Sequence, residues 1–435
     1  MSGNSKNKSR THVDDGKAGQ MVASHIFRIF LPFALGYFLA SIFRAINAVI
    51  APDLVRELGL SASELGFAVS AFFLCATLIQ IPYGILLDRY DPRRLYAIFL
   101  LLTAFGAVMI AFSQGIVLLS IGRAFIALGT AASAVTSYKV FSMWFPAERL
   151  AMVNGLAVSA GGLGMMAGTL PVEAAMQFLN WREVHLIAGA LVIAGAAAVV
   201  MVAPTKKTVS SGITLMQQIS GLHGIVNSLA FWRSAPLLFT VTGGYGSFSA
   251  IWAGPWVRDV AGLNDFETAN LMMILIGSMT VSAALTGFVA KLARRVGLSS
   301  LGVAVMTAIA FTFAVTILFL QANPSHSSVI VIWGVIGLIA PLNLIIYAAL
   351  SGEFPLELTG RLNACLTLSW FLGSFFFQNV YGWALDQFPS NNGSYALEGH
   401  RLGIGIMITA VIIALVWYFV ATMIMSKRNV EAYVR

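Results

Sequence analysis

The loop that decides the fold reads Gly84-Ile85-Leu86-Leu87-Asp88-Arg89-Tyr90-Asp91-Pro92-Arg93-Arg94. It lies between two apolar stretches, and its first carboxylate, on Asp88, stands at the end of the preceding stretch. Ionised side chains are costly inside a bilayer, so this group of charges belongs at a membrane edge rather than within a span. The sequence therefore predicts two membrane helices joined by a short, charged turn, which we call the signature loop (residues 84–94).

Composition predicts the same architecture for the rest of the chain. Of its 435 residues, 58% are hydrophobic and only 10% are charged, and the mean hydropathy is +0.83. No soluble domain needs so much apolar surface, whereas a bundle of membrane-spanning helices does. Apolar windows long enough to span predict twelve helices. They cover residues 27–52, 65–87, 95–112, 116–141, 151–176, 184–202, 235–257, 269–292, 298–320, 329–350, 362–385 and 402–425.

The formal net charge of +8 is explained by membrane topology and gives no reason to expect a nucleic-acid partner. With the N-terminus inside, 19 of the 26 Lys and Arg residues fall on the cytoplasmic side, four in outer loops and three, Arg44, Arg123 and Lys139, within spans. Because cytoplasmic loops retain positive residues, both termini are predicted to be cytoplasmic. Cys75 and Cys365 fall inside spans, so neither a disulfide nor a metal site is expected.

The spans divide into two sets of six around one longer break. Residues 1–25 are polar and without periodicity, which predicts a disordered cytoplasmic tail rather than a signal peptide. We expect a first half at 26–203, a cytoplasmic linker with an interfacial helix at 204–234, a second half at 235–425 and a C-terminal tail at 426–435. The predicted fold class is an all-α membrane protein with twelve transmembrane helices in two six-helix halves.

In this setting the signature loop resembles the G-x-x-x-D-R-x-(G/D)-x-R-R motif of the major facilitator superfamily, whose two halves hold a substrate between them. The resemblance implies that the loop latches the halves on the cytoplasmic side when the protein is open outward. The fourth-span run that begins at Arg123 and the turn at 144–149 resemble two further motifs of the family. The alternative is a solvated turn that only sets topology. The gating residues implied are Gly84, Asp88, Arg89, Arg93, Arg94, Arg123, Glu148 and Arg149.

The fifth span is rich in glycine, at Gly161, Gly162, Gly164 and Gly168. It lacks the Gly-Pro pair that is typical of the family's drug antiporters. We expect these glycines to permit close helix packing instead. Drug–proton antiport is therefore a less favoured interpretation.

Arg44 is the strongest indication of a cargo site. It lies about two turns from the outer end of the first span, where a buried arginine costs about 2.5–3.5 kcal/mol on insertion scales and so usually faces a cavity or a partner. Tyr37, Ser41, Arg44 and Asn47 follow a spacing of three to four residues and share one helix face. We expect this face to line a central cavity. The alternatives are that Arg44 extends to the outer headgroups or forms a structural pair.

A narrower resemblance supports an anionic cargo. The pair Gly36-Tyr37 with Arg44 eight residues after the glycine, together with 52–54 and 65–70, is similar to organophosphate:phosphate antiporters and related organic-anion permeases. In that branch the first-helix arginine grips the anion, and phosphate exchangers add a second arginine on the seventh helix. Here Gly244 occupies the matching position. The resemblance therefore implies a carboxylate or another mono-anion that one guanidinium can hold.

The second half offers aromatic and amide groups in place of charge. Together they predict a neutral, hydrogen-bonding wall opposite Arg44, although each alone also fits helix packing or an interfacial belt, and Trp256 is expected at the outer interface. Lys139, near the cytoplasmic end of the fourth span, either snorkels or is a second anion contact. The candidates on this wall are Tyr245, Trp252, Asn343, Trp370 and Gln378.

No proton carrier near the membrane centre is expected. All 18 acidic residues and all six histidines are placed at span ends, in loops or in tails, with Asp53 and Glu173 the nearest to carriers. This pattern favours anion exchange, facilitated movement, or symport in which the cargo and Arg44 share a proton.

The predicted function is that of a secondary transporter for a small, carboxylate-like organic anion, working by alternating access in a bacterial inner membrane. We expect a monomer in contact with lipids, coupled to a proton or a counter-anion, with no cofactor and no catalytic or metal site. A multidrug or siderophore exporter remains an alternative. A transporter-like receptor or sensor is an alternative of another class.

Overall fold

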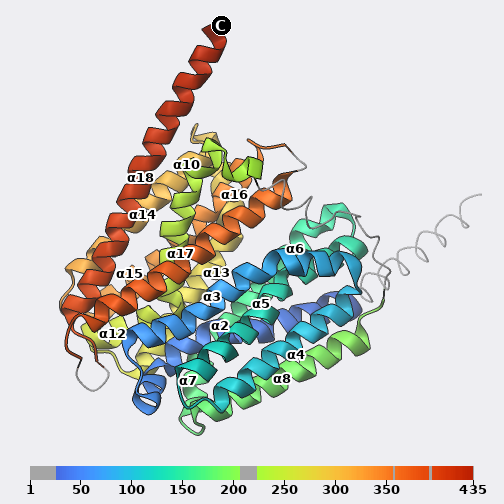
Figure 1. Ribbon diagram of the computed structural model, residues 1–435, viewed down its shortest axis with the longest axis vertical. Coiled ribbons are helices and arrows are strands. Elements are labelled where there is room, and N and C mark those ends of the chain that lie inside the picture. Colours follow the sequence, from blue (N-terminus) through green and yellow to red (C-terminus); the bar gives the residue numbers. More distant parts are fainter. Residues whose placement is uncertain (1–25, 206–222, 356–357, 391–393, 435) are drawn as a thin grey trace, which may run out of the picture.

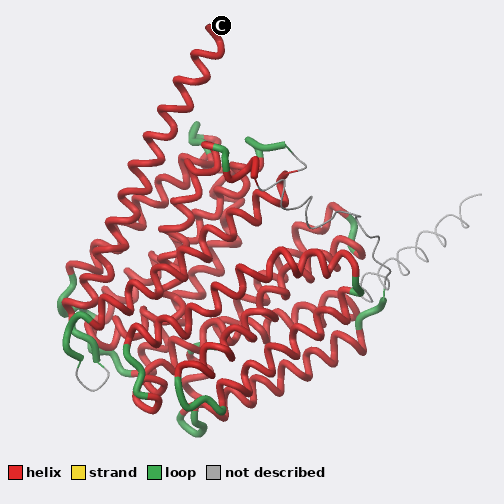
Figure 2. The backbone as a smooth tube through the Cα atoms, viewed as in Figure 1, coloured by secondary structure: helices red, strands yellow, loops and turns green. Residues whose placement is uncertain are grey.

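The computed structural model describes residues 26–205, 223–355, 358–390 and 394–434, which form helices joined by short loops and contain no strand (Figures 1 and 2). The tail at 1–25 lies wholly outside these residues, and the linker helix expected within 204–234 lies largely outside them. A short π-helical turn, Ile26–Phe30, opens the first half. Its helices are α2 (Leu31–Leu58), α3 (Ala62–Arg89), α4 (Pro92–Ala111), α5 (Ile116–Trp144), α6 (Ala147–Ala167), α7 (Leu170–Met176) and α8 (Trp181–Val202).

The second half begins with a segmented helix. It runs from Leu229 to Ala261 and carries two π-helical turns, so it begins earlier than the expected residue 235. The last helix, α18 (Leu397–Val434), continues through the residues expected as a C-terminal tail. The elements between Leu229 and Asp386 are α10 (Leu229–Leu237), η2 (Leu238–Thr242), α11 (Gly243–Ser247), η3 (Phe248–Trp252), α12 (Ala253–Ala261), α13 (Asp265–Arg295), α14 (Ser300–Leu320), α15 (His326–Ile339), η4 (Ala340–Leu344), α16 (Ile345–Ser351) and α17 (Thr359–Asp386).

Ten of the helical stretches are long and apolar enough to cross a membrane. The segmented helix from Leu229 to Ala261 and the more polar α17 bring the number of spans to twelve. The predicted all-α, twelve-helix membrane fold is confirmed. Trp256 corrects one expectation, because it is 1% exposed and packs edge-on against Trp333 inside the second half rather than at an interface.

Capping explains where several spans begin. Ser61, Asn180 and Asn264 each start a helix with a capping box, in which a glutamate three residues later accepts a hydrogen bond from the cap's own amide. All three lie at the end of the bundle opposite the signature loop. We call these the opposite end and the signature end. At the signature end, Asp91 caps α4 through the amide of Arg93.

The two halves touch mainly toward the opposite end. Asn379 of α17 donates to the Ser70 hydroxyl of α3 over 2.9 Å, and Gly254 of α12 approaches the backbone of α2 so closely that an added Cβ would lie 2.9 Å from the Ala48 carbonyl oxygen. At the signature end, the ion pairs of Lys139 with Asp88 and of Arg233 with Glu353 each join elements of one half. The halves therefore meet at one end of the bundle and splay toward the other (Figure 1).

Candidate functional site

A cavity of about 220 Å³ lies between the two halves. One side is formed by α2, α3 and α6, and the other by the segmented helix, α13, η4 and α17. Four of the polar residues predicted on α2 line it together, which is the arrangement that their spacing indicates: Tyr37, Ser41, Arg44 and Asn47.

The glycines of α6 set the position of this α2 face. A Cβ added at Gly161 would lie 2.8 Å from the Tyr37 ring, and one at Gly164 would lie 2.1 Å from the Phe38 carbonyl oxygen. A side chain at either position would push α2 away. The prediction that these glycines permit close packing is confirmed, and the packing holds Tyr37 at the cavity wall.

Arg44 is the charged side chain among the described residues that line the cavity. Around it, the Ser41 hydroxyl, the Asn47 side-chain oxygen and the Thr242 hydroxyl are buried and have no hydrogen-bond partner among the described residues. Buried polar groups normally find partners, so these groups are available to a polar ligand or to water. The site thus combines one fixed cation with several unused hydrogen-bonding groups.

The second-half wall is neutral, and only part of the predicted set forms it. Tyr245 and Trp370 line the cavity. Trp252 instead stacks on Tyr381 and donates to the Gln378 carbonyl over 3.0 Å, while Asn343 donates to the Ala304 carbonyl over 3.1 Å. Neither of these two side chains, nor the buried side chain of Gln378, belongs to the cavity lining.

Several lining residues are not singled out as cargo contacts by the sequence. Thr242 lies one turn before Tyr245 on the same helix, a spacing that is available as a signal. Thr280 on α13 and the rings of Phe72 and Phe73 on α3 give no such signal, because threonine and phenylalanine are common on membrane helices. Apolar rings next to unpaired hydroxyls suit a cargo that has one apolar face and one polar face.

Lys139 lies outside the cavity and is tied to the signature loop. Its ammonium group is 2.8 Å from the Asp88 carboxylate, and both side chains are about one-third exposed. The loop is braced further by Arg93, which donates to the carbonyls of Val200 and Ala203 at the end of α8 over 3.1 and 3.0 Å. Two helix ends of the first half are thereby joined to one loop.

The other predicted gating residues occupy varied surroundings. Gly84 is half-buried, while Arg89, Arg94 and Arg149 are exposed, and Arg94 lies 4.0 Å from Asp91. The side chain of Glu148 falls outside the described part of the chain. Arg123 is fully buried, and its three nitrogens have no hydrogen-bond partner among the described residues.

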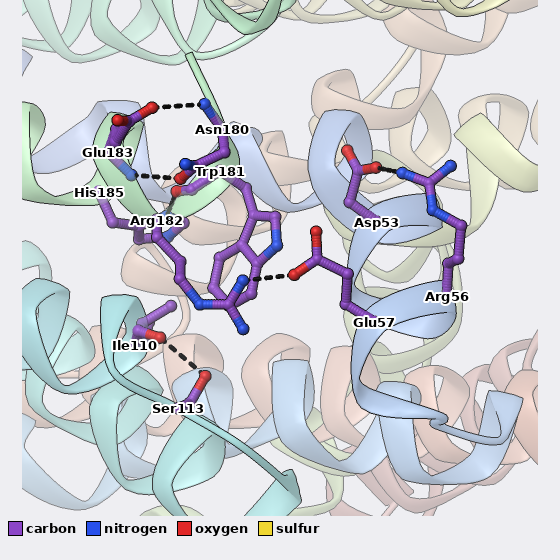
Figure 3. Close-up of polar contacts among 10 residues, drawn as sticks. All are labelled: Asp53, Arg56, Glu57, Ile110, Ser113, Asn180, Trp181, Arg182, Glu183 and His185. Carbon is purple, nitrogen blue, oxygen red and sulfur yellow. Dashed lines mark hydrogen bonds and ion pairs between the residues drawn. The ribbon is translucent and has the colours of Figure 1, made fainter.

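Polar contacts also fasten the opposite end of the first half (Figure 3). Glu57 on α2 pairs with Arg182 on α8, whose guanidinium lies 4.1 Å from the centre of the Trp181 ring. Asp53, one of the two acids nearest to a proton carrier, pairs with Arg56 one turn along the same helix. These contacts join α2 to α8 and leave Arg44, farther down α2, facing the cavity.

Two of the six histidines lie at helix ends, as expected, and are nevertheless buried. His185 on α8 and His400 on α18 are both fully buried. His185 bonds the Trp181 carbonyl over 2.8 Å, whereas His400 lies 3.0 Å from both the Asp259 carboxylate and the Tyr381 hydroxyl. Both fall within the first turns of a helix, and their burial depends on neighbouring helices that the sequence pattern does not show.

Comparison with known proteins gives one family match and several partial relatives. The profile of the Major Facilitator Superfamily matches residues 33–378. A probable sulfoacetate transporter of Cupriavidus necator is 27% identical over 36% of each chain. A galacturonate transporter of Dickeya chrysanthemi is 31% identical over 36% of this chain and 46% of its own. A hexuronate transporter of Escherichia coli K12 is 25% identical over 60% of this chain and 64% of its own.

The chain thus matches less than two thirds of the length of each of these relatives. Among solved structures, a bacterial homologue of the human lysosomal transporter Spinster, in an inward-facing and unoccupied conformation, superposes with a TM-score of 0.71. It is 18% identical, and the match covers 91% of this chain and 96% of that one. This likeness supports the fold.

Proposed function

This chain belongs to the Major Facilitator Superfamily, and from that premise we propose that it is a secondary transporter for a small organic anion with one carboxylate and a hydroxylated body. The carrying observation is Arg44, the charged side chain of a cavity that lies between the two halves. Relatives named for galacturonate and hexuronate transport point to hydroxylated monocarboxylates, and one named for sulfoacetate transport points more broadly to small organic anions.

Arg44 would take the carboxylate, because a guanidinium donates two parallel hydrogen bonds to its oxygens. The unpaired Ser41, Asn47 and Thr242 groups would take hydroxyls of the cargo body. Trp370 and Phe73 would cover its less polar face. A dianion fits less well, since Gly244 stands where phosphate exchangers carry a second arginine and faces Met407 rather than the cavity.

Alternating access would proceed by rocking of the halves about this site. We propose the inner membrane of a bacterium as the location, with the signature end and both termini in the cytoplasm, because most lysines and arginines gather there. In that orientation the halves are closed on the outer side and splayed on the cytoplasmic side. We also propose a monomer, with a proton or a counter-anion as the coupling species.

The test is uptake by proteoliposomes that contain the purified protein. We expect saturable uptake of a labelled hexuronate or aldonate, competition by other hydroxylated monocarboxylates, and little competition by phosphate esters. Uptake or efflux of lipophilic cations with no response to carboxylates would overturn the proposal and favour an exporter. Tight carboxylate binding without any flux would favour a receptor.

A further inference from the structure

Helices α3 and α17 form an antiparallel pair across the two halves (Figure 1). Ser70 lies opposite Asn379, and the ring of Phe73 lies 6.1 Å from that of Phe371. Nearer the opposite end, a Cβ added at Gly382 would lie 2.6 Å from the Ala62 carbonyl oxygen. The backbones therefore approach most closely where α3 begins and α17 ends.

At this point Asp386, the last residue of α17, caps the first turn of α3. Its carboxylate oxygens accept hydrogen bonds from the amides of Ala62 and Ser63 over 2.9 and 2.8 Å. The remaining two exposed amides of that turn are satisfied within α3, by the capping box of Ser61 and Glu64. A carboxylate from one half thus completes a helix start in the other, where the helix dipole also favours negative charge.

We propose that Asp386 is a gate residue of the transport cycle, whose carboxylate latches the first turn of α3 while the signature end is open. This inference rests on the proposed transport function, since a latch has a role only if the halves rock. Opening the opposite end must break both amide bonds.

The experiment measures the separation of the halves without any cargo. Spin labels are placed at exposed positions of the opposite end, at Phe178→Cys in the first half and Asn323→Cys in the second, in a Cys75→Ser, Cys365→Ser background. Pulsed electron–electron distances are then recorded in lipid nanodiscs. For Asp386→Ala we expect the ratio of the wide to the narrow population to rise about tenfold, as for loss of hydrogen bonds to a charged group.

Asp386→Asn keeps one acceptor oxygen and loses the charge, so we expect a smaller shift and use it if the alanine variant does not fold. Glu64→Gln is the matched control, because it weakens the same helix start entirely within the first half; its distances are expected to stay as in the parent. Unchanged distances in both Asp386 variants would overturn the proposal. An equal shift in Glu64→Gln would also overturn it, since it would assign the effect to helix fraying. Neither result depends on which cargo is carried.

Discussion

The two walls of the central cavity differ in how they are built. The first-half wall carries Arg44 and unpaired polar groups on one regular helix face, held in place by the glycines of α6. The second-half wall is neutral and comes from several elements, with Tyr245 on a helix interrupted by π turns and Trp370 on α17 as its large side chains. Under the proposed function, the difference would divide the labour: the first half would hold the anion and the second half would close over the cargo body.

Removing the positive charge of Arg44 from the first-half wall should have the largest effect on cargo binding. For Arg44→Ala we expect cargo affinity to fall about 100-fold, because a buried carboxylate would lose its charged partner. Arg44→Lys should retain part of the affinity, since it keeps the charge without the paired donors. Isothermal titration with a monocarboxylate measures both.

Arg56→Ala serves as the control for a lost positive charge, as its side chain is 72% exposed and lies outside the cavity. Its affinity should match that of the parent. Equal loss in Arg56→Ala and Arg44→Ala would mean that overall charge, and not the first-half wall, holds the anion.

The next largest effect is expected on stability, when the packing of α6 against α2 that supports the first-half wall is disturbed. Gly164→Ala would place a methyl group against the Phe38 carbonyl and is expected to destabilise the protein by about 1–3 kcal/mol. Gly155→Ala on the same helix meets nothing within 4 Å and should leave stability nearly unchanged. The thermal midpoint in one detergent compares them, and similar midpoints would contradict the tight α2–α6 contact.

The unpaired polar groups should have a smaller effect that depends on the cargo. We expect Asn47→Ala to weaken binding of a hydroxylated acid by about threefold to tenfold, as for one neutral hydrogen bond. An unsubstituted carboxylate of similar size should bind this variant almost as it binds the parent. A competition assay with both compounds gives the ratio of variant to parent affinity for each. Equal losses would show that Asn47 does not hydrogen-bond to hydroxyls of the cargo.

The smallest effect on cargo binding is expected for Lys139→Ala. Since Lys139 pairs with Asp88 outside the cavity, cargo affinity should change by less than about threefold, the scale of a partly exposed ion pair. Titration of the purified variant measures this. A loss comparable to that of Arg44→Ala would restore Lys139 as a second anion contact.

The second-half wall illustrates why sequence periodicity fails there. Tyr245 and Trp252 are seven residues apart, a spacing that predicts one shared face. The π turn from Phe248 to Trp252 adds a residue to the turn between them and rotates the later part of the helix. Trp252 therefore points to Tyr381 and Gln378. On α17, Trp370 and Gln378 share an approximate face, yet only Trp370 borders the cavity, because α3 covers the helix farther along.

The sequence by itself determined the membrane class, the twelve spans, the signature loop and the α2 stripe with Arg44. These features depend on local properties, namely runs of apolar residues, the cost of charge in a bilayer and the regular period of one unbroken helix. Only the tertiary structure decided that Lys139 pairs with Asp88, that Asp386 caps α3 and that Trp370, but not Trp252 or Gln378, lines the cavity with Arg44. Those contacts join residues far apart in the chain, and they depend on how whole helices pack, which no local pattern encodes.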